Sequence, residues 1–171
     1  ERLVGSEMCI RDRHNTVQNL IDIEKNIQSN LSDLNIKNQT KIIAVSKTFG
    51  VDKILQLIHH GHTDFGENKV QEAVEKWTKL REEKPNLKLH MIGKLQTNKV
   101  KYAVKLFDYI HSVDNEKLAR KISEEDKKIN KKTKVFIQVN IGNEDQKSGL
   151  SKNEALKLAT YCKEIKLEVI G

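Results

Sequence analysis

Short apolar runs rich in β-branched residues alternate along this chain with longer stretches whose apolar residues recur at helical spacing. The clearest case is the run 41–47, which is followed by Val51, Ile54, Leu55 and Ile58 at helical intervals. Continuous or alternating apolar runs indicate strands, and a period near 3.6 residues indicates helices. We therefore predict helices between strands over 41–47, 63–66, 87–92, 109–113, 135–141 and 167–170.

A helical stripe also precedes the first strand. From His14 onward, apolar residues such as Val17, Leu20 and Ile27 recur at helical spacing, and the stripe ends near Asp33. Residues with short polar side chains commonly mark helix boundaries. We predict one helix over this stretch.

The first residues, 1–13, follow neither period. The run 6–13 resembles a translated linker, and such segments are excluded from reasoning about a fold. We expect a non-native or disordered leader over 1–13 and a single domain over 14–171.

The order of the elements is typical of parallel βαβ units, because helices cover both faces of such a sheet. A doubly wound sheet usually has a glycine-rich turn after its first strand, and 47–50 lacks the GxGxxG pattern. Polar residues instead follow several strands at the ends where (β/α)8 barrels build active sites, among them Lys47, Asn68 and Ser112. We predict an α/β fold of the (β/α)8 TIM-barrel type with about six of eight strands present and the others beyond Gly171. A smaller open sheet is the alternative.

The net charge of +7 raises nucleic acid as a partner, since lysine and arginine neutralise phosphates. The lysines stand beside acidic residues, however, as in 76–83 and 124–128, and aromatic residues make up only 5% of the chain. Proteins that bind single strands usually offer aromatic stacking platforms. We therefore expect solvated helix faces and no nucleic-acid partner, and keep a basic RNA-binding module as a distant alternative.

No apolar run approaches the roughly 18 to 20 residues that a membrane-spanning helix needs. Cys9 and Cys162 stand far apart and form no CxxC motif, so we expect neither a disulfide nor a zinc site. Of the neighbours His59, His60 and His62, the first two point to different faces of a helix, so we expect no metal site there. These features favour a cytoplasmic protein.

Lys47 is the residue with the clearest chemistry. It ends a predicted buried strand, where partial burial would disfavour its ammonium form and supply the free amine that attacks aldehydes. A lysine that merely extends from a strand end into solvent is the alternative.

Several motifs that occur in order make the chain similar to one family. They are Ala44-Val-Ser-Lys-Thr48, Asp64-Phe-Gly-Glu-Asn68, His90-Met-Ile-Gly93 followed by Leu95-Gln-Thr-Asn-Lys99, and Ile110-His-Ser-Val-Asp114. With these motifs the chain resembles the YggS/PROSC family of pyridoxal phosphate homeostasis proteins, from about His14 to its end.

The resemblance implies a barrel related to the N-terminal domain of alanine racemase, with pyridoxal 5'-phosphate held as a Schiff base on Lys47. It implies a role in intracellular vitamin B6 homeostasis and no established catalytic activity. A racemase-like enzyme that uses the same cofactor is the alternative. The implied partners are the cofactor and client enzymes met only transiently, and we expect a monomer.

The other candidate cofactor-binding residues follow the predicted strands. Asn68 either hydrogen-bonds near the cofactor or caps the next helix, and Gly93 permits close approach of the backbone to a ring. By resemblance to alanine racemases, Lys147 would lie near the phenolic oxygen of the cofactor and stabilise its charge. The full set is Lys47, Asn68, Gly93, Gln96, Asn98, Ser112 and Lys147. We expect the phosphate-binding loops beyond Gly171.

Overall fold

The structure, a computed structural model, describes residues 4–36, 40–142 and 148–171, with side chains from Thr16 onward in those ranges. The chain forms two compact units, residues 1–63 and residues 64–171.

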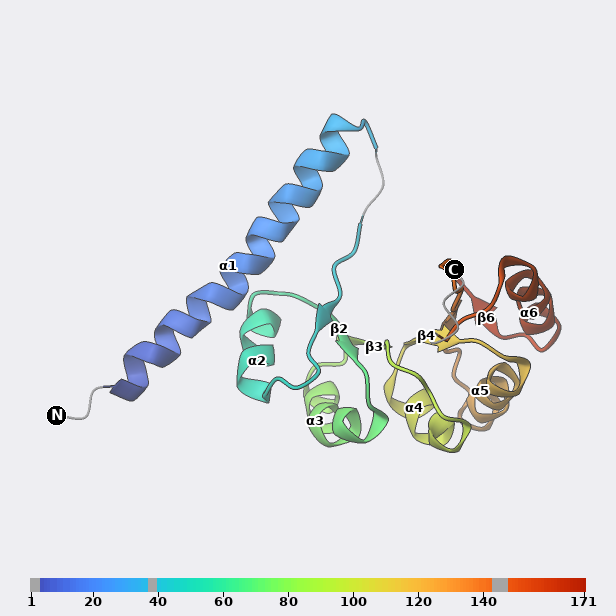
Figure 1. The fold of residues 1–171 in the computed structure, drawn as a ribbon. Coiled ribbons are helices and arrows are strands. Elements are labelled where there is room, and N and C mark those ends of the chain that lie inside the picture. The colour runs from blue at the N-terminus through green and yellow to red at the C-terminus, as the bar shows by residue number, and fades with distance from the viewer. Residues whose placement is uncertain (1–3, 37–39, 143–147) are drawn as a thin grey trace. The chain divides into compact units, whose positions relative to one another are not determined.

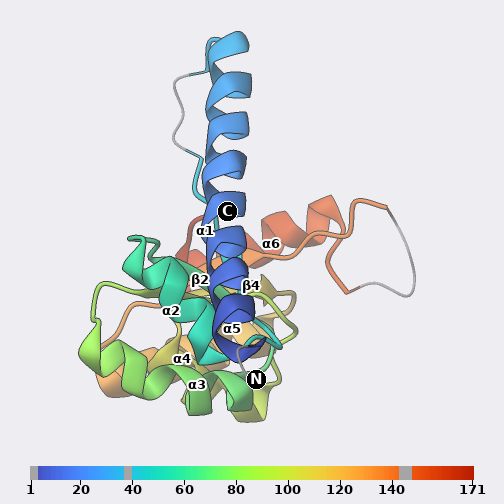
Figure 2. The ribbon, with the colours of Figure 1, turned by 90° about the vertical axis from the view of Figure 1, so that its left-hand side faces the viewer.

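The first unit contains α1 (Val4–Asp33), β1 (Ala44–Val45) and α2 (Val51–His59). Helix α1 is one continuous helix (Figure 2). It ends at Asp33, as the apolar stripe predicted, and Asn35 adopts φ 51° directly afterwards. Asparagine tolerates this left-handed conformation, which commonly closes the end of a helix. Strand β1 is shorter than the predicted run 41–47.

The proposed leader stays a prediction. Helix α1 begins at Val4, but side chains before Thr16 lie outside the described part of the chain. The limits 1–13 and 14–171 are therefore not tested by this structure.

The second unit is a parallel sheet whose strands β2 to β6 lie side by side in chain order. A helix follows each of the first four of these strands, as Figure 1 shows, so the predicted βαβ alternation is confirmed. The elements are β2 (Asp64–Glu67), α3 (Val70–Glu83), β3 (Lys88–Met91), the 3-10 helix η1 (Thr97–Lys99), α4 (Val100–Leu106), β4 (Tyr109–Val113), α5 (Glu116–Ile129), β5 (Lys134–Ile137), α6 (Lys152–Glu164) and β6 (Glu168–Val169).

Strand β5 differs from its prediction, because it ends at Ile137 and not at Ile141. Val139 instead forms an isolated parallel bridge with Leu150, and the Asn140 N–H donates to the Leu150 carbonyl at 2.9 Å. The apolar run 135–141 thus continues past β5. Val135 pairs with β6, whereas Val139 pairs with Leu150, which is nearer in the sequence.

Local sequence signals explain two of the helix starts. The Asn115 side chain accepts from the Leu118 N–H at 2.8 Å and caps α5. Ser151 and Glu154 form a reciprocal capping box at the start of α6. Both motifs satisfy backbone donors that a helix start leaves unpaired.

The core of the second unit includes a charged residue. Glu67, the last residue of β2, is fully buried beside Trp77, which packs on Phe65 with ring centroids 5.0 Å apart. The Glu67 carboxylate accepts from Trp77 Nε1 at 2.9 Å and from Lys76 Nζ at 2.9 Å. Buried charges are tolerated when they are paired and hydrogen-bonded. This carboxylate therefore joins β2 to α3.

We predict that Glu67→Ala destabilises the full-length protein by about 3 kcal/mol or more, because it leaves a partly buried lysine and a buried indole N–H without their acceptor. The matched control is Glu72→Ala, which removes another Lys–Glu pair of the same unit. That pair joins Lys69 and Glu72 at 2.8 Å on the surface, so its loss should cost less than about 1 kcal/mol. Urea unfolding followed by circular dichroism measures both, and equal losses would contradict the prediction.

Candidate functional site

Lys47 lies in a tight turn directly after β1. The Phe49 N–H donates to the Ser46 carbonyl at 3.2 Å, which closes the turn around Lys47 and Thr48. Thr48 adopts φ 66°, a conformation that crowds a β-branched side chain. Such strain costs of order 1–3 kcal/mol and is found most often at functional sites. The turn therefore holds Thr48, the neighbour of Lys47, in a conformation that local preference alone would not select.

The exposure of Lys47 corrects one expectation. Ser46 is buried, with 4% of its surface exposed, whereas Lys47 and Thr48 are exposed. The sequence predicted a partly buried amine at the end of a strand. The strand ends two residues earlier, at Val45, so the turn displays the amine on the surface of its unit.

Three of the predicted residues come together at the carboxyl ends of β2, β3 and β4. We call Asn68, Gly93 and Ser112 the carboxyl-edge cluster. The Ser112 hydroxyl donates to the Gly93 carbonyl at 2.7 Å, and a Cβ on Gly93 would lie 2.3 Å from the Asn68 carbonyl oxygen. Parallel strands bring their carboxyl ends to one edge of a sheet, which explains why residues so far apart in sequence meet.

This contact explains why position 93 is a glycine, and the explanation differs from the one predicted from the sequence. The glycine lets the β3 segment approach the backbone of Asn68 closely, where a side chain would collide with main-chain atoms. Approach to a ring, the reason given by the sequence, stays a prediction. Asn68 is half-buried and does not cap α3, whose N-cap is Lys69. Of the two roles weighed for Asn68, the capping role is therefore wrong.

The remaining predicted residues belong to other segments of the chain or lie outside the described residues. Gln96 precedes η1 and Asn98 lies within it, and both are exposed. Nearby, Lys94 Nζ donates to the Ser148 hydroxyl at 3.4 Å. Lys147 falls in the segment 143–147, outside the described residues. Lys47 belongs to the first unit and the carboxyl-edge cluster to the second.

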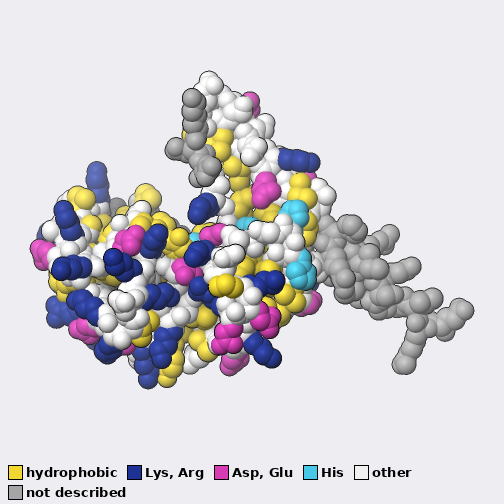
Figure 3. All heavy atoms as spheres, turned by 180° about the vertical axis from the view of Figure 1, so that it is seen from behind, with side chains coloured by type: hydrophobic (Ala, Val, Ile, Leu, Met, Phe, Trp, Pro, Cys, Tyr) yellow, Lys and Arg dark blue, Asp and Glu magenta, His cyan; other side chains and the backbone are white. Residues whose placement is uncertain are grey.

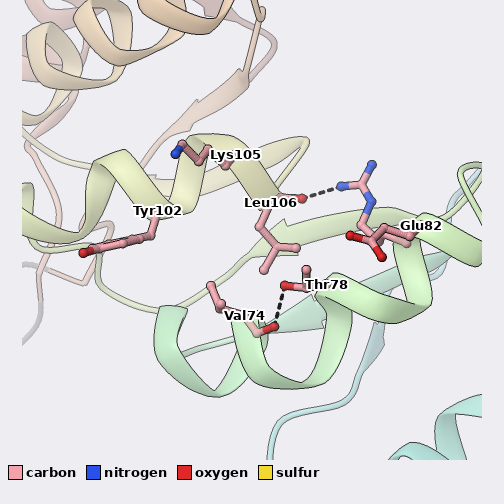
Figure 4. Close-up of a pocket in the computed structure, with 7 residues that line it drawn as sticks. Val74, Thr78, Glu82, Tyr102, Lys105 and Leu106 are labelled. Atoms are coloured by element: carbon pink, nitrogen blue, oxygen red, sulfur yellow. Dashed lines mark hydrogen bonds between the residues drawn. The ribbon is translucent and has the colours of Figure 1, made fainter.

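Two surface hollows in the second unit involve other residues. A cavity of about 440 Å³ lies between α3 and α4, where Val74, Leu106 and Tyr102 form the apolar part of its lining (Figure 4). Thr78 and Arg81 on its rim donate to the carbonyls of Val74 and Leu106. No predicted site residue lines this hollow, so it does not enter the candidate site.

A larger hollow of about 860 Å³ lies at the opposite, amino-terminal end of β6, and its lining includes Lys127, Lys163 and Lys166. Lysines near helix carboxyl termini complement the negative end of the helix dipole. Basic side chains are also spread over much of the face in Figure 3, with acidic side chains between them. This distribution agrees with solvated helix faces.

The sequence analysis did not identify the strained Thr48, nor three residues that lie on β2, β3 and β4 before the carboxyl-edge cluster. Asp64, His90 and His111 form a chain of hydrogen bonds across β2, β3 and β4. The two histidines occur within the motifs quoted above, and a titratable residue in the middle of a buried strand was the available signal.

We predict that Gly93→Ala destabilises the full-length protein by about 1–3 kcal/mol, because the new methyl group collides with the Asn68 backbone. Gly50→Ala is the control. A Cβ at Gly50 would meet only the end of the exposed Asp52 side chain, which can rotate away, so the change should stay within about 0.5 kcal/mol. Chemical denaturation compares the two, and a Gly93 variant as stable as the Gly50 variant would count against the close packing.

Comparison with curated proteins finds relatives that bear one name. The chain is 41% identical over 143 residues to the pyridoxal phosphate homeostasis protein of Pasteurella multocida and covers 61% of its length. It is 36% identical over 152 residues to the protein of the same name from Haemophilus influenzae and covers 64% of it. The chain thus spans less than two thirds of these relatives, while they match 83% and 88% of the chain.

Solved structures show the same relationship. PipY of Synechococcus elongatus, solved with pyridoxal phosphate bound, matches with a TM-score of 0.68 and 30% identity over 82% of this chain and 68% of its own. Alanine racemase of Clostridium difficile matches 98% of this chain with a TM-score of 0.62 at 16% identity, a likeness of fold alone. These matches confirm the predicted α/β barrel class related to alanine racemase.

The match to a family agrees with these relatives. Residues 19–171 match the alanine racemase N-terminal domain, which covers most of the chain and nearly all of its described elements. The sequence resemblance, the fold and the named relatives point to one group of proteins. The chain belongs to the alanine racemase N-terminal domain family, within the YggS/PROSC group of pyridoxal phosphate homeostasis proteins.

Proposed function

We propose that this chain binds pyridoxal 5'-phosphate through a Schiff base on Lys47 and serves intracellular homeostasis of that cofactor. The observation that carries the proposal is the strained turn at Thr48, which presents an exposed lysine shortly after β1. When bound, the cofactor supplies an aldehyde with which a lysine amine condenses, with loss of one water molecule.

The position of Lys47 fits that chemistry. The amine must reach the aldehyde carbon, and the exposed Lys47 side chain is accessible to a ligand. The turn limits the directions in which the side chain can extend, because Phe49 N–H and Ser46 carbonyl close it. A backbone that is ordered before binding reduces the conformational entropy lost when a ligand binds.

The carboxyl-edge cluster supports a binding surface for the same ligand. Its polar groups lie at the strand ends where barrel proteins of this kind bind ligands. Ser112 uses its hydrogen to hold Gly93, so its oxygen remains able to accept from a ligand. Gln96 and Asn98 offer exposed amide groups in the segment that follows β3. We propose that these residues orient the cofactor, with Lys147 as a neighbouring cation.

We further propose that the protein carries the cofactor without turning over a substrate. The curated relatives are named as homeostasis proteins and not as enzymes. Transient delivery to client enzymes follows from such a role. No helix in the described part of the chain is both long and apolar enough to span a membrane. A monomer in the cytoplasm and the absence of a nucleic-acid partner complete the proposal.

The direct test is covalent trapping on the full-length protein. Pyridoxal phosphate should produce the absorption band of a Schiff base, and borohydride reduction should fix the label on Lys47, as peptide mass spectrometry would show. Lys47→Arg keeps the positive charge but lacks a condensing amine, so it should abolish both the band and the label. Lys41→Arg, which changes an exposed lysine before the same strand, should leave both intact. A label on a different lysine would refute the assignment of Lys47.

A further inference from the structure

A continuous chain of side chains crosses three strands of the second unit. Asp64 Oδ1 on β2 lies 3.1 Å from His90 Nε2 on β3, and His90 Nδ1 lies 3.0 Å from His111 Nε2 on β4. Asp64 and His90 are buried, with 9% and 5% of their surfaces exposed, and His111 is half-buried. We call these three residues the Asp–His–His chain.

Aromatic rings hold both imidazoles in place. His90 stacks on Tyr109 with centroids 4.3 Å apart and an interplanar angle of 3°. His111 stacks on Phe136 of β5 with centroids also 4.3 Å apart. The rings leave each imidazole little freedom to turn, so the hydrogen-bond geometry is fixed from β2 to β5.

The chemistry of the chain fixes the direction of its hydrogen bonds. A carboxylate only accepts, so His90 Nε2 donates to Asp64. Neutral His90 then has an acceptor at Nδ1, and His111 Nε2 donates to it. If the pair takes up one proton on His90, both of its ring nitrogens become donors, so a hydrogen bond to His111 requires the reverse direction, with Nε2 of His111 accepting. A second proton would place two N–H donors and two positive charges face to face, which breaks the bond.

The electrostatic surroundings favour a neutral His111. Burial, with a smaller contribution from His90, lowers the pKa of His111 to about 4. The other charged residues on the strands beside β4 are Lys88 on β3 and Lys134 on β5, and the next strands outward add Glu67 on β2 and Glu168 on β6. Lys134 lies 5.8 Å from the Tyr109 ring centroid and 3.9 Å from a Glu168 carboxylate oxygen.

The backbone ladder is regular only before His111. The pairing of β3 with β4 joins His90 with Tyr109 and Met91 with Ile110. Against β5, the register of β4 shifts between Ile110 and Val113. His111 and Ser112 lie in that irregular stretch, and there side chains connect β4 to β3: His111 to His90, and Ser112 to Gly93.

We propose that His90 and His111 are positioning residues whose hydrogen bond, anchored by Asp64, holds the irregular stretch of β4 against β3 and thereby places Gly93 and Ser112 in the carboxyl-edge cluster. Side-chain bonds can fix the position of a strand where its backbone ladder is interrupted. The consequence for cofactor affinity rests on the proposed function, whereas the placement of this stretch does not.

The sign of the pH effect follows from the histidine pKa. Unfolded His111 titrates near 6.5 and folded His111 near 4, so the folded state binds fewer protons between these values. The stability that neutral His111 contributes is therefore complete above about pH 6.5 and is lost as the pH falls toward 4.

Two variants of the full-length protein test the proposal. His111→Phe keeps a ring over Phe136 but removes the bond to His90. It should raise hydrogen exchange at the Gln138 N–H, which is bonded to the Val113 carbonyl beyond the irregular stretch, by about tenfold. The Asp108 N–H, bonded to Leu89 before that stretch, should change far less. His111→Gln offers an amide group to His90 and should restore the protection of the Gln138 N–H from exchange. Because glutamine does not titrate, this variant should lack the pH dependence of stability that His111 contributes between pH 6.5 and 4.

The control is His59→Gln, which changes an exposed histidine of α2 and should alter neither readout. In the wild type, nitrogen NMR shifts should show neutral His111 at pH 6. If His111 titrates near pH 6.5, or if His111→Phe leaves exchange at Gln138 unchanged, the proposal is overturned.

Cofactor binding is measured separately. His111→Phe should weaken pyridoxal phosphate binding by at least about tenfold, and His111→Gln should restore it. Unchanged affinity in His111→Phe would overturn the proposed dependence of cofactor affinity on the hydrogen bond between His90 and His111. If the wild type binds no pyridoxal phosphate, the proposed function fails, and the exchange and NMR measurements still decide the role of the histidines.

Discussion

The carboxylate of Glu67 joins the parts of the second unit on which the candidate site depends. Its side chain accepts from Lys76 and Trp77 and so fixes the end of β2 against α3. Its backbone carbonyl accepts from the Ile92 N–H at 2.9 Å and so fixes the end of β3. The next residue in the chain, directly after β2, is Asn68. A buried charge at this point is costly unless every partner is in place, so the strand ends have little freedom to shift.

From that fixed point the carboxyl-edge cluster is built by close contacts. Gly93 packs against the Asn68 backbone because it lacks a side chain, and Ser112 holds the Gly93 carbonyl from the next strand. His111 of the Asp–His–His chain lies in the irregular stretch of β4, next to Ser112. Burying a polar group alone costs free energy, whereas a network in which each buried polar group is hydrogen-bonded to another favours a single arrangement of the strands. The site therefore depends on side-chain bonding as much as on the sheet.

The turn at Lys47 is strained, in contrast to the hydrogen-bonded polar groups of the carboxyl-edge cluster. Thr48 occupies a backbone region that glycine would adopt at little cost, and the protein keeps a β-branched residue there. A strained turn persists only if the surrounding structure holds it, and stability is often given up where a reactive group must be held in one direction. This strain, and not the burial expected from the sequence, distinguishes Lys47 from the many other lysines of the chain.

Hydrophobic periodicity alone determined the order of strands and helices, because apolar side chains must face the core with period 2 or 3.6 wherever they lie. Motifs read in order also identified Lys47, Asn68, Gly93 and Ser112 as candidates, since their places after strands depend on local sequence. The strand lengths were less predictable, as β1 shows, because hydrogen-bonding partners decide where a strand ends.

Tertiary structure alone decided which of these residues meet and why. The packing of Gly93 on Asn68 and the bonding of His90 to His111 join residues more than twenty positions apart, and no local pattern records such distances. The strain at Thr48 is likewise invisible in sequence, since threonine rarely adopts a positive φ unless its surroundings impose it. The sequence by itself determined the elements and the candidate lysine; the contacts between strands decided the geometry, because long-range packing and not local preference sets register and strain.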